Sequence, residues 1–178
     1  MSVLVIADII NNELSIDLTG KTVDAVTHLG EVTILCASDD ANNSSIEASK
    51  INGVTNVLNV SNPLFKNGLA EPMSALIVEL SKNFEFIVSP ASAFGKNILP
   101  RVAALIDVMV ITDISKIIDS NTFERPIYAG NALQTVKSKD NKKVISVRTA
   151  NFETPEMSNS ANILLSLIHI SEPTRLHG

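Results

Sequence analysis

Few side chains in this sequence are of types that do chemistry, and they are scattered. Asp39 and Asp40 are adjacent carboxylates, but neighbours on a chain point apart, so a loop is the better interpretation. The single cysteine, Cys36, lies in an apolar run, where burial makes a thiol inert. His28 shares the face of an expected helix with charged residues, which is typical of a solvated surface. No Ser/His/Asp set, metal-ligand cluster or CxxC pair is present, so we predict no catalytic and no metal-binding residue.

Gly95 and Lys96 occupy a more suggestive position. They follow a predicted strand and precede a predicted helix, and α/β folds commonly bind ligands against helix amides at such turns. Neither GxxxxGK[ST] nor GxGxxG occurs over residues 91–97, and one lysine is a weak phosphate signal. Direct nucleotide binding therefore stays an alternative to a structural role, in which glycine relieves a tight turn and small residues let a neighbouring chain approach.

Four further side chains are candidates for contacts with other chains or domains. Arg101 falls on the expected helix among apolar residues, where we expect a structural ion pair rather than an interface role. Arg125 lies in an expected β-ribbon, and a turn at Gly130 could aim the only tyrosine, Tyr128, outward. Arg148 ends the last predicted strand and faces either solvent or another domain. The candidate subunit or domain interface comprises Gly95, Lys96, Arg101, Arg125, Tyr128 and Arg148.

The pattern of apolar residues indicates the strands and helices that position these side chains. Unbroken apolar runs recur at residues 3–7, 32–37, 57–60, 84–88 and 108–111. Runs of this kind indicate strands that are buried on both faces of a sheet. Helix signals separate them, so we predict parallel βαβ units in an open three-layer, mainly parallel, Rossmann-like α/β sheet.

Three of the predicted helices have recognisable ends or faces. One begins with a capping box at Ser44 and Glu47. The next carries Pro72 in its first turn, followed by an apolar stripe at Met73, Leu76, Ile77 and Leu80. The last spans about residues 97–106, with Pro100 in its first turn, where backbone donors have no intrahelical partner.

The pattern changes after residue 114. Strand-like runs at residues 115–118, 123–136 and 144–147 are joined by polar turns, which predicts antiparallel hairpins appended to the sheet. We therefore expect an α/β domain over residues 1–152 and a polar linker over residues 153–164. Residues 165–175 match a translated reading frame of a transposase adapter used for sequencing libraries, so residues 165–178 are expected to be a non-native tail.

Charge and hydropathy exclude several classes of partner. The net charge is −5 and Lys and Arg form no cluster, which argues against nucleic acid. No apolar run approaches the roughly 20 residues of a membrane-spanning helix, so we expect a soluble protein without membrane insertion. The apolar run at residues 3–7 follows Met1 without a basic presequence, which predicts a cytoplasmic, bacterial location.

Several segments together resemble one known family. They are Gly-Leu-Ala-Glu-Pro at 68–72, Ser-Pro-Ala-Ser-Ala-Phe-Gly-Lys-Asn-Ile-Leu-Pro-Arg-Val-Ala-Ala at 89–104, Phe-Glu-Arg-Pro-Ile-Tyr-Ala-Gly-Asn-Ala at 123–132 and Val-Arg-Thr-Ala-Asn-Phe at 147–152. In order and spacing they resemble the amino-terminal domain of the electron transfer flavoprotein alpha subunit. The resemblance covers residues 2 to about 152 and implies a fold like that of the adenine nucleotide alpha hydrolases.

The resemblance also implies a function. Members of this family pair an alpha and a beta subunit around one FAD, with AMP in the beta subunit. They are electron carriers rather than enzymes, and they pass electrons from acyl-CoA and related dehydrogenases to a membrane quinone oxidoreductase. The flavin site lies mainly in a second alpha-subunit domain, whose Gly-Gly-Arg-Gly type loop is not in this sequence. This domain is then expected to dock the beta subunit and brace the flavin domain.

Two alternatives stay open. One is a stand-alone adenine-nucleotide-binding α/β module of the universal stress protein or PP-loop type, although no SGGxDS loop is present. The other is a relative of the same family that serves anaerobic metabolism or nitrogen fixation.

Overall fold

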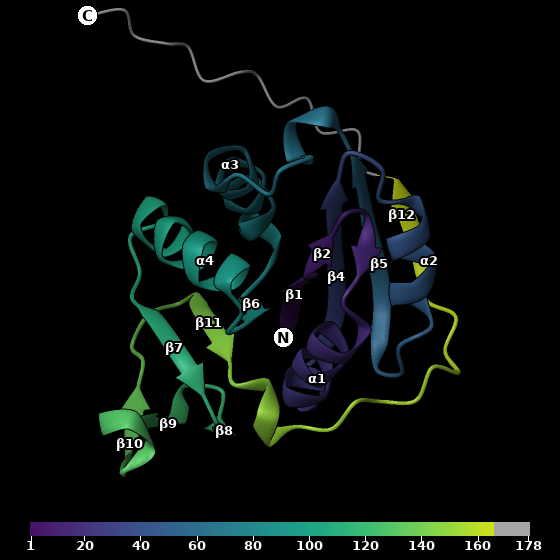
Figure 1. The fold of residues 1–178 in the computed structure, drawn as a ribbon. Coiled ribbons are helices and arrows are strands. Elements are labelled where there is room, and N and C mark those ends of the chain that lie inside the picture. Colours follow the sequence, from purple (N-terminus) through teal and green to yellow (C-terminus); the bar gives the residue numbers. More distant parts are fainter. Residues whose placement is uncertain (166–178) are drawn as a thin grey trace, which may run out of the picture.

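A single parallel sheet organises the molecule (Figure 1). The computed structural model describes residues 1–165. Seven strands follow the order β12-β5-β4-β1-β6-β11-β7, and every neighbouring pair is parallel. Their bounds are β1 (Ser2–Ile6), β4 (Glu31–Ser38), β5 (Val54–Ser61), β6 (Phe86–Pro90), β7 (Val110–Ile114), β11 (Lys143–Val147) and β12 (Asn162–Leu165). The predicted three-layer α/β architecture is confirmed.

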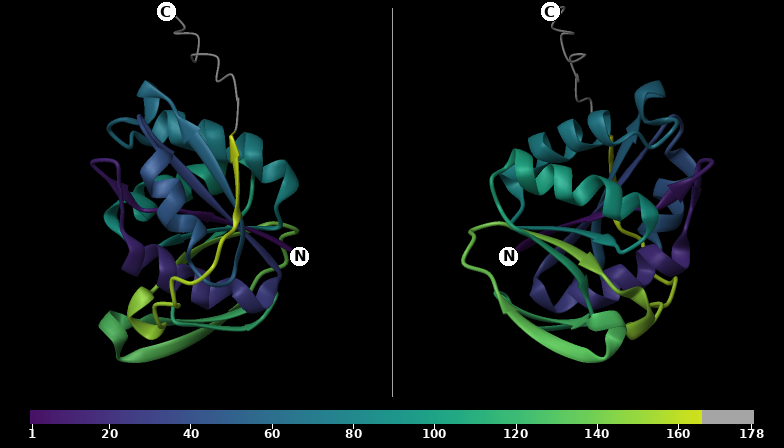
Figure 2. Two further views of the ribbon diagram at one scale, coloured as in Figure 1. Left: turned by 90° about the vertical axis from the view of Figure 1, so that its right-hand side faces the viewer. Right: turned by 60° about the vertical axis from the view of Figure 1, so that its left-hand side comes forward.

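Helices cover both faces of the sheet, as the two further views show (Figure 2). They are α1 (Ile16–Val26), α2 (Asn42–Ser49), α3 (Ala70–Leu80) and α4 (Ala93–Leu105). Buried residues of α1 and α2 pack in one apolar cluster with one face of the strands. Those of α3 and α4 pack in a second cluster with the other face. The sheet is therefore buried on both sides, which explains its unbroken apolar strands.

A small antiparallel sheet is appended at the carboxyl end of β7. It consists of β8 (Lys116–Asp119), β9 (Thr122–Ile127) and β10 (Ala132–Lys137), with β9 in the middle. Phe123 on β9 is fully buried in the cluster of α1 and α2, so this sheet is anchored to the main body. The predicted ribbon is confirmed for these strands.

Strand β11 corrects the expected path of the chain. Residues 144–147 were expected to form a further antiparallel hairpin, but β11 lies between β6 and β7 and is parallel to both. All five of its residues are buried. The hairpin prediction was wrong here because an apolar strand of this kind is stabilised by burial on both faces rather than by an adjacent turn.

Two helix starts also differ from the expectation. The capping box at Ser44 was wrong, because α2 begins at Asn42 and the buried Ser44 donates its hydroxyl to the Asn12 carbonyl at 2.8 Å. Helix α4 begins at Ala93, where Ser92 caps it by accepting a hydrogen bond from the Gly95 amide at 3.2 Å. Pro100 therefore lies inside α4 rather than in its first turn. The apolar stripe of α3 is as predicted, since Met73, Leu76 and Ile77 are buried and Leu80 is partly buried against the same cluster.

The segment expected to be a linker is fixed to the body of the domain. The Asn159 amide donates to the carbonyls of Ile51 at 3.1 Å and Val54 at 2.7 Å. The Thr154 hydroxyl donates to the Asp17 carboxylate at 2.7 Å. Residues 162–165 then form β12, which pairs with β5 at the edge of the main sheet. Residues 166–178, which contain most of the expected non-native tail, lie outside the described residues.

Within residues 1–165, no helix combines the length and the apolar character that crossing a bilayer requires.

Candidate functional site

The chain reverses its direction across the sheet next to β1. It goes from β1 to β4 and β5 on one side, then crosses to β6 on the other. In open α/β sheets, ligands bind at the carboxyl ends of the strands at such a switch point. A cavity of about 490 Å³ lies at this edge. Its lining includes Asp8, Ser38, Lys66, Ser92, Ala93 and Phe94.

Gly95 lies in the first turn of α4, beside this cavity, and it is buried. A Cβ at this position would come within 2.2 Å of the Pro90 carbonyl oxygen and 2.3 Å of Ser89 Oγ. No side chain fits at such distances. Glycine is therefore required for α4 to pack closely against the end of β6, in agreement with the structural interpretation of this glycine.

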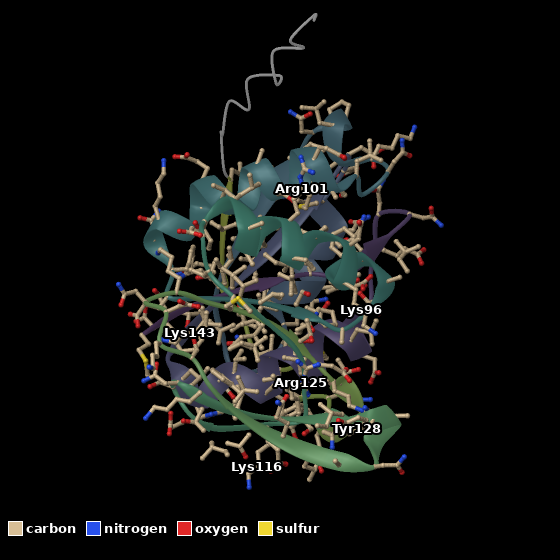
Figure 3. All side chains as sticks on the ribbon, turned by 90° about the vertical axis from the view of Figure 1, so that its left-hand side faces the viewer. Lys96, Arg101, Lys116, Arg125, Tyr128 and Lys143 are labelled. Atoms are coloured by element: carbon tan, nitrogen blue, oxygen red, sulfur yellow. The ribbon has the colours of Figure 1, made fainter. Side chains whose placement is uncertain are left out.

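Lys96 and Arg101 lie farther along α4 and are exposed (Figure 3). No carboxylate within residues 1–165 forms an ion pair with Arg101. The expected structural ion pair was therefore wrong for the described part of the chain. The guanidinium instead reaches water from the solvent side of α4.

Arg148 lies just beyond the end of β11 and forms an ion pair. Its Nη1 is 3.3 Å from Asp113 Oδ2, and both side chains are partly exposed. The Asp113 backbone is held in the left-handed region (φ 58°), and its amide donates to Ser146 Oγ at 2.8 Å. This pair therefore connects the carboxyl ends of β11 and β7, close to where the antiparallel sheet begins.

Arg125 and Tyr128 belong to the antiparallel sheet (Figure 3). Tyr128 is 78% exposed, in a turn where Tyr128, Ala129 and Gly130 all have positive φ. This confirms that the turn aims the tyrosine outward. Arg125 Nε is buried and has no hydrogen-bond partner within residues 1–165. Buried donors are rarely left unpaired, so Arg125 is an unusual feature of this surface.

The structure thus places the six candidates in two groups rather than one site. Gly95, Lys96 and Arg101 belong to α4. Arg125 and Tyr128 belong to the antiparallel sheet. Arg148 lies between these two groups, at the end of β11. On one side the Ala91 amide, just before α4, donates to the Val147 carbonyl at 2.8 Å, and on the other the Arg148 amide donates to the Ile114 carbonyl at 2.8 Å.

Sequence reasoning missed Asp8 and Ser38. Both lie at carboxyl ends of strands, beside the cavity, and they are only 3% and 5% exposed. Ser38 Oγ has no hydrogen-bond partner within residues 1–165. Each residue follows an apolar run directly in the sequence, at residues 3–7 and 32–37. The rule that ligands bind at carboxyl ends of strands could have identified both.

Residues considered for catalysis are placed as expected. Cys36 is buried, and burial raises the pKa of its thiol to about 12. The region of Asp39 and Asp40 is a bend, and His28 is exposed. No group of three or more potential metal ligands occurs within residues 1–165.

Comparison with known proteins places the chain in one family. The protein-family model described as "Electron transfer flavoprotein domain" matches residues 15–164 of this chain. The chain is 52% identical over 153 residues to the electron transfer flavoprotein subunit alpha of Paracoccus denitrificans, which covers 86% of this chain and 50% of that protein. It is 46% identical over 164 residues to that of Bradyrhizobium diazoefficiens, covering 92% and 52%. It is 43% identical over 171 residues to the mitochondrial subunit alpha of Dictyostelium discoideum, covering 90% and 48%. The chain therefore spans about half the length of these curated relatives.

Proposed function

This chain belongs to the electron transfer flavoprotein family, and we propose that it is the docking scaffold of an alpha subunit. In this proposal it binds a beta subunit and braces the part of the alpha subunit that carries the flavin. The observation that carries the proposal is the 52% identity to an alpha subunit over 153 residues. The heterodimer, rather than this chain, then carries electrons. We propose acyl-CoA and related dehydrogenases as donors, a membrane quinone oxidoreductase as acceptor, and the bacterial cytoplasm as the location.

The antiparallel sheet supports a docking role. Strand β10 is an edge of that sheet within residues 1–165, so its outward N–H and C=O groups can pair with another chain. Leu133 on β10 is 64% exposed and Tyr128 is 78% exposed. Exposed large apolar side chains near an open strand edge are typical of interaction surfaces. The opposite edge strand, β8, lies beside α1.

Arg125 adds a polar contribution to the same surface. It lies opposite Gln134 of β10 in the strand register. Its Nε is buried, so the other N–H groups of the guanidinium would donate a hydrogen bond to a carbonyl or carboxylate of a partner chain, and hydrogen bonds to charged groups are among the stronger ones. We therefore define the docking surface as Arg125, Tyr128 and the edge of β10.

The described residues do not form a cradle for FAD. A dinucleotide needs a glycine-rich turn that lets its pyrophosphate approach the backbone closely. The turn from β6 into α4 is Pro90-Ala91-Ser92, and the space beside Gly95 is filled by Pro90 and Ser89. We therefore propose that FAD is held mainly by the other half of the alpha subunit, and AMP by the beta subunit.

Co-expression with a beta subunit tests the proposal. The chain and a tagged beta subunit from Paracoccus denitrificans would be produced together and purified through the tag. We expect the chain to co-purify in equal amounts, because the docking surface requires no FAD. A chain that fails to co-purify, or that retains stoichiometric FAD by itself, would contradict the scaffold role.

A further inference from the structure

The turn between α2 and β5 contains an asparagine followed by a glycine, Asn52 and Gly53. A glycine in this position has no Cβ, so its amide nitrogen can approach the side-chain carbonyl of the preceding asparagine closely and displace ammonia from it. The sequence contains one other pair of this kind, Asn67 and Gly68, just before α3. The two pairs are chemically identical, so any difference in their reactivity comes from the fold.

The two glycine amides differ in their hydrogen bonds. The Gly68 amide donates to the Phe65 carbonyl at 3.1 Å. The Gly53 amide donates to no acceptor within residues 1–165, and Gly53 is exposed. The attacking nitrogen must lose its proton to the solvent, and a hydrogen bond to a carbonyl holds that proton in place. Gly53 therefore supplies the better nucleophile of the two.

The side chain of Asn52 is also the better electrophile. Its Oδ1 accepts a hydrogen bond from the Ser158 hydroxyl at 3.1 Å. Negative charge develops on this oxygen when a nitrogen attacks Cγ, and a donor that is already in place stabilises this charge. The Asn67 side chain is exposed and has no such donor among the described residues.

The fold itself requires the glycine that makes Asn52 reactive. Gly53 has a positive φ of 91°, and a Cβ at this position would lie 2.3 Å from Thr27 Cγ2. A larger residue at position 53 would therefore be strained and would also clash with the end of α1. The reactive pair is thus built into the packing of this turn.

Asn52 also helps to hold the strap, which we define as residues 153–161. The strap runs from the end of β11 past α1 to α2 and β12 (Figure 1). The Asn52 amide donates to the Glu156 carbonyl at 2.9 Å, and the Asn52 side chain accepts the bond from Ser158. A chemical change at Asn52 therefore acts directly on two contacts of the strap.

We propose that Asn52 is a site of spontaneous deamidation and that its conversion loosens the strap. The Gly53 amide nitrogen loses its proton and bonds to Asn52 Cγ, the bond from Cγ to Nδ2 breaks, and the side-chain nitrogen leaves with a proton as ammonia. Water then opens the resulting five-membered imide at either of its carbonyls, which leaves aspartate or isoaspartate. Isoaspartate lengthens the main chain by one methylene before Gly53 and so distorts the turn that holds the strap. The reaction consumes only water and involves no partner chain.

Incubation of the whole 178-residue chain in mildly alkaline buffer, followed by peptide mapping with mass spectrometry, tests the site. In the folded chain we expect Asn52 to be converted at least about fivefold faster than Asn67, because a hydrogen bond holds the Gly68 proton. In urea the two pairs should react at similar rates, because unfolding removes both hydrogen bonds. If Asn67 is converted as fast as Asn52 in the folded chain, the proposal is overturned.

Ser158→Ala tests the activating hydrogen bond. We expect it to slow conversion of Asn52 about fivefold and to leave Asn67 unchanged, because one donor to the developing charge is lost. Ser160→Ala is the matched control, since Ser160 is exposed in the same strap and its hydroxyl bonds no described residue. An unchanged or faster rate at Asn52 in Ser158→Ala would show that this hydrogen bond restrains the side chain, and would overturn the proposal.

Limited proteolysis tests the effect on the strap. The converted chain carries an additional carboxylate, so ion exchange separates it from the unconverted chain. We expect a protease to cut the converted chain faster between residues 153 and 160. Equal cutting of the two forms would overturn the proposed loosening.

Discussion

Gly95 lies so close to Pro90 that a Cβ at position 95 would be 2.2 Å from the Pro90 carbonyl oxygen. This backbone contact fixes the start of α4 against the end of β6. The same helix start forms one wall of the cavity and leads into the exposed Lys96. The close packing of Gly95 against Pro90 therefore positions both this wall of the cavity and the exposed Lys96.

Gly95→Ala should destabilise the fold. Helix propensity alone predicts a gain in stability of about 1 kcal/mol for this change. Overpacking against the backbone costs about 1–3 kcal/mol, and a carbonyl oxygen at 2.2 Å places the cost at the upper end of that range. We expect a net loss of about 2 kcal/mol in the free energy of unfolding, measured by urea denaturation. Gly130→Ala is the control: its Cβ meets nothing within 4 Å, so only its positive φ costs energy, about 1 kcal/mol. If Gly95→Ala instead stabilises the fold, the close contact between position 95 and the Pro90 carbonyl oxygen is disproved.

Asn159→Ala should loosen the segment that leads to β12. The change removes two hydrogen bonds, to the carbonyls of Ile51 and Val54, and should cost about 1–2 kcal/mol. It should also speed proteolysis between residues 153 and 160. Ser158→Ala removes a single bond at an exposed site, to Asn52, and should change stability by less than about 0.5 kcal/mol. Equal effects of the two variants would contradict a specific role of Asn159.

The Asp17 carboxyl should titrate at higher pH in Thr154→Val. The hydroxyl of Thr154 and then the amine of Lys21 hold the pKa of Asp17 below its usual value. Because that pKa is lowered, the associated stabilisation is present above pH 3.8 and is lost as the pH falls. NMR titration of the side-chain carboxyl measures the change. The pKa of Asp119, which the Asn121 amide holds low, should stay the same in this variant.

Cys36 should make the fold less stable at alkaline pH. Burial raises its pKa from 9.0 to about 12, so the unfolded chain loses the thiol proton first. The stabilisation is complete below pH 9 and is lost as the pH rises toward 12. The difference in unfolding free energy between the parent chain and Cys36→Ala should therefore fall over that range. In the folded chain at pH 8, the thiol should not react with a disulfide reagent, and rapid labelling there would contradict its burial.

Leu133→Asp and Tyr128→Ala should each weaken beta-subunit binding. Both side chains are exposed on the docking surface, and loss of a central aromatic or apolar contact typically costs at least about 1 kcal/mol in affinity, or about fivefold in Kd. Binding can be measured by calorimetry or by yield in co-purification. Ile118→Asp is the matched control, because Ile118 is 51% exposed on the opposite edge strand, β8. If only Ile118→Asp reduces binding, the docking surface has been assigned to the wrong edge.

The sequence predicted most of the architecture because the relevant signals are local. Apolar runs identified β1, β4, β5, β6 and β7 within a few residues. It identified the strand at residues 144–147 but not the position of that strand, β11, in the parallel sheet, and it missed β12. A strand far along the chain is placed by the open sheet edge or gap that it fills, which no local pattern encodes. The sequence also failed for the start of α4, which was expected near residue 97 but lies at Ala93 after the Ser92 cap, seven residues before Pro100.

For the candidate site, the sequence by itself determined the family-specific segments, the lack of a glycine-rich phosphate loop and the outward position of Tyr128. Only the tertiary structure decided that Arg101 lacks an ion pair within residues 1–165 and that Arg148 contacts Asp113. Only the tertiary structure brought Asp8, Ser38 and the start of α4 around one cavity. The physical reason is that parallel strands align their carboxyl ends at one edge, so residues from distant segments meet there. Which strands become neighbours depends on the packing of the whole sheet.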